Sequence, residues 1–298
     1  MKKILLGTLF VLSPLLSESD IEVYTAYGNP HRAVIEGRVL NEREFTESSV
    51  KDSWLKNTWR KLKHVVNDEE KNAPITLTIG RESFKTKTDH EGYFEFELIN
   101  QSPKAWKNHQ NIELKLDSVN KFVVVSLYIL DEKVTQGILS DFDDTVIVSN
   151  VTSKMKLLKN TFLKNYKQRE VVPEMLERFK KLTLNENTPL FFITGSPRQL
   201  QPTIHLFLNH HGFPQRTIIT KKAHGKNPDS LTDQLGYKLG KIERIIKLYP
   251  HVEWYCFGDS GEKDREVYES LAKKYPKSIR AIYIRDVESG KILTIKAP

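Results

Sequence analysis

The chain has 298 residues and carries 46 Lys and Arg against 38 Asp and Glu, which gives a formal net charge of +8. This length is typical of about two domains of roughly 150 residues each, long enough to build a core without disulfides. The basic balance attracts anionic membranes or nucleic acid without choosing between them. The single cysteine, Cys256, excludes an intramolecular disulfide framework, and we expect it to be a small core residue.

The first 19 residues have the pattern of a secretory signal peptide. Lys2 and Lys3 precede an apolar stretch at residues 4–16, and Ser17 and Ser19 follow it, which is the order found in such a signal. The apolar stretch is short for a membrane span. We therefore expect an exported protein, periplasmic or secreted. The alternatives are an uncleaved anchor that keeps the protein at a membrane, or a buried first element of a cytosolic protein.

Residues 20–134 alternate short β-rich runs with turns, and helical patterns are scarce there. The alternation predicts a small antiparallel β-sandwich, with residues 89–92 as a hairpin turn. Residues 54–63 interrupt it with two tryptophans and four basic side chains. Such a segment is suited to a lipid interface, and an amphipathic insertion packed on its own domain is the alternative. The predicted strands lie at residues 33–40, 75–79, 93–98, 112–116 and 122–130.

From residue 135 to residue 298 the pattern changes to apolar runs that alternate with helical segments. This change predicts an α/β fold with a largely parallel sheet and helices on its faces. The clearest helices are expected at residues 173–184 and 197–211, and Gly212 ends the second one. We therefore expect two domains, with a boundary near residue 134.

The first apolar run of this second part ends in two carboxylates, Asp141 and Asp143. If the run is a buried parallel strand, both carboxylates emerge where ligands bind in open α/β sheets. Asp141 could attack a phosphoryl group and form an aspartyl-phosphate, while Asp143 donates and then removes a proton. Such an acidic site needs a divalent cation to accept an anionic substrate, and Mg²⁺ suits oxygen ligands with a phosphate. The alternative is that both aspartates merely cap a turn.

Three later segments favour the site over the turn. A second apolar run ends at Thr194, whose hydroxyl is suited to holding a phosphate. A third run ends at Asp259, which would complete a metal site with Asp141 and Asp143 and with Asp264 as a ligand or supporting partner. Lys238 opens an amphipathic segment and could offset charge on the phosphoryl group, with Lys241 one helical turn later as its competitor.

This ordered set resembles the four motifs of the haloacid-dehalogenase superfamily. A wider set of segments lies at residues 27–28, 37–40, 88–94, 140–146, 195–197, 258–264 and 284–286. Through these segments the chain resembles, over nearly its whole length after the leader, the actin-patch-type phosphatidate phosphatase family. The resemblance implies a Rossmann-like catalytic domain, Mg²⁺ dependence and conversion of phosphatidate to diacylglycerol. It assigns the site to Asp141, Asp143, Thr194, Lys238 and Asp259. Two residues depart from the family pattern, because Arg198 stands where a tryptophan is common and Arg265 where a proline is common.

The segments between Thr145 and Thr194 and between Ser196 and Lys238 are mostly taken up by the helices and strands expected for the core. They leave little room for a large inserted cap domain, so we expect an uncapped site. An open site suits a phospholipid head group at a membrane surface, and we infer no obligate protein partner. A nucleic-acid end, a phosphoprotein or a sugar phosphate is the alternative substrate. Nucleic acid is less favoured, because no stacking platform of interleaved aromatic and basic residues is evident. A third interpretation is a secreted binding module whose second half is only a scaffold.

Overall fold

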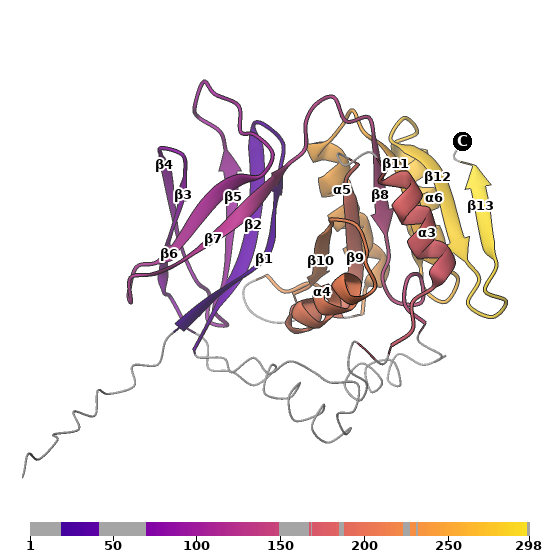
Figure 1. Cartoon of the computed structure of the whole chain (residues 1–298), viewed down its shortest axis with the longest axis horizontal. Coiled ribbons are helices and arrows are strands. Elements are labelled where there is room, and N and C mark those ends of the chain that lie inside the picture. The colour runs from indigo at the N-terminus through magenta and orange to yellow at the C-terminus, as the bar shows by residue number, and fades with distance from the viewer. Residues whose placement is uncertain are drawn as a thin grey trace, which may run out of the picture.

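The structure, a computed structural model, describes residues 19–41, 70–148, 167, 169–184, 188–222, 227–230 and 232–296 (Figure 1). The predicted signal segment, apart from Ser19 at the start of the first described strand, and the tryptophan-bearing segment 54–63 lie outside the described residues. Within these ranges the chain is a mixed α/β protein with two sheets. None of the helices described is both long and apolar enough to cross a membrane.

The N-terminal part forms a sheet of seven described strands in the order β4-β3-β6-β7-β1-β2-β5. Neighbouring strands are antiparallel except β1 and β7, which pair in parallel over two positions. The two edge strands β4 and β5 also contact each other, and the inward side chains of all parts of the sheet share one apolar core. The strands are β1 (Ser19–Gly28), β2 (Arg32–Asn41), β3 (Pro74–Ile79), β4 (Glu82–Lys87), β5 (Tyr93–Ile99), β6 (Gln110–Leu116) and β7 (Lys121–Ile129).

Five of these strands match the predicted runs, whereas β1 and β4 were not predicted. The predicted hairpin at residues 89–92 is wrong, because β4 pairs with β3 and β5 pairs with β2. The turn itself is present: the Asp89 carboxylate accepts hydrogen bonds from the backbone N–H groups of Glu91 and Tyr93. Gly92 adopts a φ of 75°, which glycine tolerates without steric cost. A tight turn therefore joins two strands that do not pair with each other.

The C-terminal part forms a six-stranded sheet in the order β10-β9-β8-β11-β12-β13. The strands β8 to β12 pair in parallel, and β13 is antiparallel to β12. This arrangement confirms the predicted largely parallel sheet. Its strands are β8 (Gln136–Ser140), β9 (Leu190–Pro197), β10 (Thr217–Lys221), β11 (Glu253–Asp259), β12 (Ile279–Arg285) and β13 (Ile292–Lys296).

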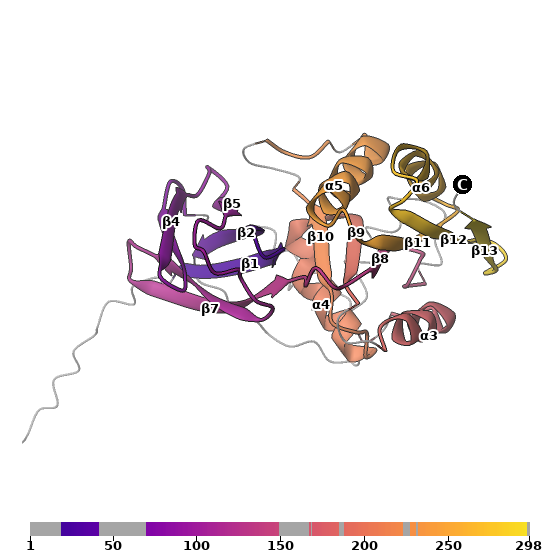
Figure 2. The ribbon, with the colours of Figure 1, turned by 90° about the horizontal axis from the view of Figure 1, so that it is seen from above.

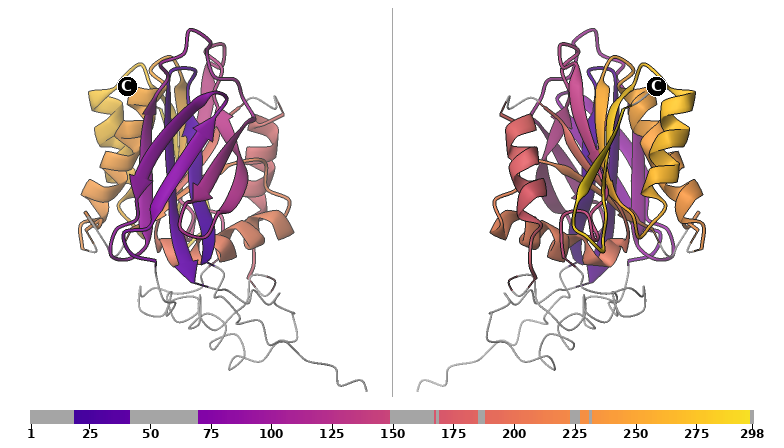
Figure 3. Two further views of the ribbon diagram at one scale, coloured as in Figure 1. Left: turned by 90° about the vertical axis from the view of Figure 1, so that its left-hand side faces the viewer. Right: turned by 90° about the vertical axis from the view of Figure 1, so that its right-hand side faces the viewer.

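Helices cover both faces of the parallel sheet, as Figures 2 and 3 show. The helices α5 (Gln234–Leu248) and α6 (Asp264–Lys274) pack on one face, and α3 (Pro173–Leu182) and α4 (Gln201–His210) pack on the other. Each face has its own core of buried apolar residues. Because both faces are covered, the central strands read as continuous apolar runs such as Phe191, Phe192 and Ile193.

The predicted helix boundaries differ slightly from the structure. Pro197 belongs to β9, and the short 3₁₀ helix η2 (Arg198–Leu200) precedes α4. The helix α5 begins before Lys238, because the Asp233 side chain caps it by accepting a hydrogen bond of 2.7 Å from the Gly236 N–H group. Lys238 therefore lies inside the first turns of α5.

The two parts contact each other along the β10 edge of the parallel sheet, where β1 lies beside β10 (Figure 1). The Tyr249 hydroxyl donates a 3.0 Å hydrogen bond to the Gly28 carbonyl, and the Asn29 amide donates one of 2.9 Å to the Leu248 carbonyl. Tyr27 also belongs to the core beneath α5 and α6. The N-terminal sheet is thus held against the part that carries the acidic motifs.

Candidate active site

The two carboxylates Asp141 and Asp143 follow directly after β8, at the carboxyl end of the parallel sheet. Both side chains are buried. The Asp141 N–H group donates a 2.8 Å hydrogen bond to the Phe257 carbonyl and so extends the pairing of β8 with β11. Arg285, at the end of the next strand β12, donates a 2.8 Å hydrogen bond to the Asp144 carbonyl. The loop that carries both carboxylates is therefore fixed by two neighbouring strands.

Asp141, Asp259 and Asp264 form one acidic cluster, in which one carboxylate oxygen of each residue lies within 4.8 Å of the others. Asp259 ends β11 and Asp264 begins α6. The close approach of Asp264 requires Gly258, because a Cβ atom there would lie 2.4 Å from the Asp264 Cβ atom. The sequence prediction that these distant segments converge is thus met in the structure. Asp143 is not part of this three-member cluster within the described residues.

The cluster has the properties of a cation site. The Asp259 Oδ1 atom accepts hydrogen bonds from the N–H groups of Gly261 and Glu262, but its buried Oδ2 atom has no hydrogen-bond partner in the described part of the chain. Burial, followed by the charge of Asp264, raises the pKa of Asp259 to about 8. Burial also raises the pKa of Asp141, with Lys238 opposing the shift. Three buried carboxylates that repel one another fit a hard divalent cation such as Mg²⁺.

Lys238 lies inside this acidic cluster. Its Nζ atom donates hydrogen bonds of 2.8 Å to Asp141 and 3.1 Å to Glu262, and a third to Asp264. Burial disfavours the ammonium charge, but Asp141, Asp264 and Glu262 outweigh it and raise the pKa of Lys238 well above its usual value. Lys241 instead lies 3.3 Å from the Asp229 carboxylate. Of the two candidate lysines, Lys238 is the one that contacts the acidic cluster.

Thr194 and Asp143 form the other side of the site. The hydroxyls of Thr194 and Ser196 each donate a 3.1 Å hydrogen bond to the Asp143 Oδ2 atom. The Ser196 N–H group in turn donates a 3.0 Å hydrogen bond to the Thr194 hydroxyl, and Tyr237 donates one of 3.1 Å to the Thr194 carbonyl. The end of β9 is therefore tied to Asp143 and also to α5.

The pKa of Asp143 is raised by burial, although Arg169 and the hydrogen bonds from Ser196 and Thr194 pull it downwards. A carboxyl group with a raised pKa can hold a proton that it later donates. Burial thus makes ionisation of Asp143 harder, while the hydroxyls of Thr194 and Ser196 hydrogen-bond to its carboxylate.

Three residues of the site were not predicted. Ser196 and Glu262 lie within the motif segments 195–197 and 258–264, where their polar side chains were the available signal. Arg169 places its Nη2 atom 3.9 Å from the Asp143 Oδ1 atom, and its side chain is buried. It lies in no segment with a recognisable pattern, so only the folded chain brings it to Asp143.

A largely parallel α/β sheet with converging acidic, basic and hydroxyl groups at its carboxyl ends is the arrangement of an enzyme active site on an open sheet. Residues 136–286, slightly more than half of the chain, match the model of the family described as phosphatidate phosphatase APP1, catalytic domain. The chain belongs to this family.

Two curated relatives share this region. The chain is 30% identical over 151 residues to phosphatidate phosphatase APP1 of Saccharomyces cerevisiae, an alignment that covers 50% of this chain and 25% of that protein. It is 26% identical over 212 residues to an uncharacterized protein of Schizosaccharomyces pombe, covering 69% of this chain and 35% of that protein. The chain thus spans only about a quarter to a third of the length of these relatives.

Similarity to solved structures is low. A carbohydrate acetylesterase from Xanthomonas citri aligns with a TM-score of 0.25 and 8% identity, over 80% of this chain and 68% of that one. A family two carbohydrate esterase from Cellvibrio japonicus aligns with a TM-score of 0.24 and 14% identity, over 90% of each chain. Scores at this level carry no information on the fold or function of the chain.

Proposed function

We propose that this protein is a Mg²⁺-dependent phosphatase that hydrolyses phosphatidate to diacylglycerol through an aspartyl-phosphate. The observation that carries the proposal is the convergence of Asp141, Asp259, Asp264 and Lys238 beside Asp143. The family membership supports phosphatidate as the substrate. We further propose that residues 135–298 are a Rossmann-like catalytic domain of the haloacid-dehalogenase superfamily, preceded by a β-sandwich at residues 20–134.

Asp141 is the nucleophile in this proposal. Lys238 holds the Asp141 Oδ1 atom at 2.8 Å, so that the Oδ2 atom attacks phosphorus while the bond from phosphorus to the lipid oxygen breaks. Asp143 gives its proton to the departing lipid oxygen. It then takes a proton from water, which attacks phosphorus and releases Asp141. This order needs an Asp143 that carries a proton at the start, and burial shifts its pKa in the direction that favours the protonated form.

The remaining side chains bind and orient. The hydroxyls of Thr194 and Ser196, which face Asp143 in the structure, would hold the phosphoryl oxygens. A bound Mg²⁺ would neutralise charge between the carboxylates and the substrate phosphate. Asp141, Asp259 and Asp264 are the residues that would hold it, and the unpartnered Asp259 Oδ2 atom is a ready ligand. The additional role of Asp143 as a metal ligand stays a prediction.

The test is phosphate release from phosphatidate vesicles by the purified protein, with Mg²⁺ and with excess chelator. We expect release only with Mg²⁺ and none from Asp141→Asn. Asp131→Asn is the matched control, because Asp131 is exposed and precedes β8 at the opposite end of the strand. A parallel panel contains a nucleotide, a polynucleotide, a sugar phosphate, a phosphopeptide and an aryl phosphate. Preference for a soluble ester would overturn the lipid assignment, and failure on every ester would favour the binding-module interpretation.

We also propose that residues 1–19 are a signal peptide and that the protein is exported, with peripheral membrane contact during turnover. The basic start and short apolar core of the segment support this proposal. Mass determination of the mature N-terminus in its native host tests it. An intact Met1 in a cytosolic fraction would overturn it.

A further inference from the structure

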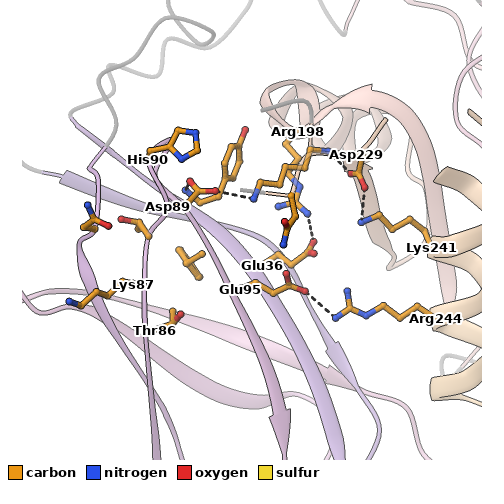
Figure 4. A pocket seen from close by; sticks show the side chains of 16 residues that line it. Glu36, Thr86, Lys87, Asp89, His90, Glu95, Arg198, Asp229, Lys241 and Arg244 are labelled. Carbon is orange, nitrogen blue, oxygen red and sulfur yellow. Dashed lines mark hydrogen bonds and ion pairs between the residues drawn. The ribbon is translucent and has the colours of Figure 1, made fainter. Parts of the chain in front are cut away.

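A polar cavity of about 650 Å³ separates the N-terminal sheet from η2 and α5 (Figure 4). Its charged walls are paired across the gap between the two parts of the chain. Arg198 pairs with Glu36 on β2, Lys222 pairs with Asp89 before β5, and Arg244 pairs with Glu95 and Glu97 on β5. These ion pairs connect the two parts of the chain. One of them is made by Arg198, two residues after Ser196 of the proposed phosphate site.

The contact made two residues after Ser196 in sequence is the ion pair between Arg198 and Glu36. The Arg198 Nη2 atom lies 2.7 Å from the Glu36 Oε2 atom, and both side chains are buried. The guanidinium also lies 5.6 Å from the ring centre of Tyr93 and 5.8 Å from that of Tyr24. Two aromatic rings and a carboxylate from the N-terminal sheet therefore enclose one arginine of the catalytic part.

Two neighbours of Arg198 make the same connection. The Gln199 amide donates a 3.1 Å hydrogen bond to the Tyr93 hydroxyl, and the Gln201 amide donates one of 2.5 Å to the Tyr24 carbonyl. Gln201 also accepts a 2.6 Å hydrogen bond from Thr220 on β10. The whole turn after β9 is therefore clamped between the N-terminal sheet and β10.

The clamped turn directly follows the residues proposed to bind phosphate. Ser196 lies two positions before Arg198, and its hydroxyl and N–H group contact Asp143 and Thr194. A shift of the turn would move Ser196 away from Asp143. Displacements of about 1 Å in an active site can reduce a rate about 100-fold.

We propose that Arg198 is a positioning residue, whose ion pair with Glu36 lets the N-terminal sheet hold Thr194 and Ser196 against Asp143. This inference rests on the proposed phosphatase function. It assigns the N-terminal sheet a role in the geometry of the phosphate site in addition to its own fold. Arg244 provides the contrast, because it ties the same two parts together from α5 through ion pairs with Glu95 and Glu97. In the described part of the chain it makes no hydrogen bond or ion pair to Glu36 or to η2.

The experiment compares three variants with wild type: Arg198→Met, Arg198→Lys, and a double variant that combines Glu36→Gln and Arg198→Met. Arg244→Met is the matched control. The double variant avoids leaving an unpaired buried charge, so it separates positioning from folding. Turnover of an aryl phosphate gives kcat and KM without a membrane, and inorganic phosphate is the inhibitor. Hydrogen exchange of the peptide that spans residues 192–202 reports the turn without any need for activity.

We expect about a tenfold or larger loss of kcat/KM and weaker phosphate inhibition in the Arg198→Met and double variants. Arg198→Lys should recover part of the loss, and Arg244→Met should retain near wild-type values. Exchange in residues 192–202 should be faster only in the Arg198 variants. If wild-type protein hydrolyses the ester and the double variant keeps its kinetics and exchange, the positioning role is wrong and the function stands. If wild-type protein hydrolyses nothing, the proposed function fails, and unchanged exchange would still overturn the clamp.

Discussion

Replacing Asp259 by asparagine should stabilise the metal-free protein. The Asp259 Oδ1 atom accepts backbone hydrogen bonds that an asparagine oxygen can also accept, whereas the Oδ2 atom is buried among carboxylates without a partner. An asparagine N–H₂ group in that place could donate to the neighbouring Asp141 or Asp264 carboxylate. The substitution therefore removes a buried charge and adds a donor.

The magnitude follows from the pKa of Asp259, which rises from 3.8 to about 8 on folding because of burial and the charge of Asp264. A raised carboxyl pKa means that ionisation is harder in the folded state, so stability is lost as the pH rises from the unfolded to the folded pKa. Each pH unit between the unfolded pKa and pH 7 costs about 1.4 kcal/mol of folding stability, so the ionised Asp259 destabilises the fold near pH 7 by at most about 4 kcal/mol. Asp141 and Asp264 titrate together with Asp259, so a proton can reside on any of the three carboxyl groups, and the destabilisation caused by Asp259 alone is smaller than this limit. We expect a gain of about 1–4 kcal/mol.

The assay is thermal unfolding with excess chelator, across the range from about pH 4 to about pH 9. Asp259→Asn should unfold at a higher temperature than wild type above about pH 6, and the difference should shrink towards about pH 4 as Asp259 becomes protonated in both states. Mg²⁺ at about 100 times its Kd should stabilise wild type by about 2.7 kcal/mol and the variant by less. A variant that is less stable than wild type in chelator, or equally stabilised by Mg²⁺, would refute the assignment of Asp259 to a cation site. Asp131→Asn serves as the control.

Three further predictions concern single side chains of the site. Lys238→Met should lose turnover and about 3–5 kcal/mol of stability, because it leaves buried carboxylates without their cationic partner. Lys241→Met should change stability by about 1 kcal/mol or less. Urea unfolding and ester hydrolysis measure both variants, and equal effects would contradict the placement of Lys238. Asp143→Asn should slow both formation and hydrolysis of the aspartyl-phosphate by about 100-fold or more, which rapid-quench kinetics measures, and unchanged rates would remove its acid/base role. Thr194→Val should raise KM and weaken inhibition by inorganic phosphate by about tenfold; a variant with unaltered phosphate inhibition would exclude the phosphate contact.

Two members of the acidic cluster could be predicted from sequence because Asp141 and Asp259 stand at the ends of apolar runs, and Asp264 follows Asp259 by five residues at the start of α6. Parallel strands bring their carboxyl ends to one edge, so Asp141 and Asp259 were expected at the same edge once both runs were assigned to one sheet. The direct pairing of β8 with β11 then brings them close together. The choice between Lys238 and Lys241 could not be made in this way, since both lie on α5 only one turn apart. The contact of Lys238 with Asp141, across 97 residues of sequence, places Lys238 in the acidic cluster and supports the proposal that it is the lysine of the site.

Features that depend on contacts between segments distant in sequence escaped prediction. The Arg198–Glu36 contact joins residues 162 positions apart, and no local pattern records it. Arg169 likewise reaches Asp143 only through the fold. The strand β4 has exposed residues at alternate positions and little apolar signal, so it was not predicted, and the turn before β5 was mistaken for a hairpin. Local turn chemistry at Asp89 was visible, but strand partners are set by tertiary packing.

The most direct test of the central claim is to look for phosphate on Asp141 itself. Purified protein is mixed with phosphatidate vesicles and Mg²⁺, quenched in acid within one turnover, and its peptides are analysed by mass spectrometry. The account predicts one phosphoryl group on the peptide that contains Asp141, and none when chelator is present or when Asp141 is replaced by asparagine. Steady release of phosphate without a phosphorylated Asp141 peptide at any quench time would contradict it.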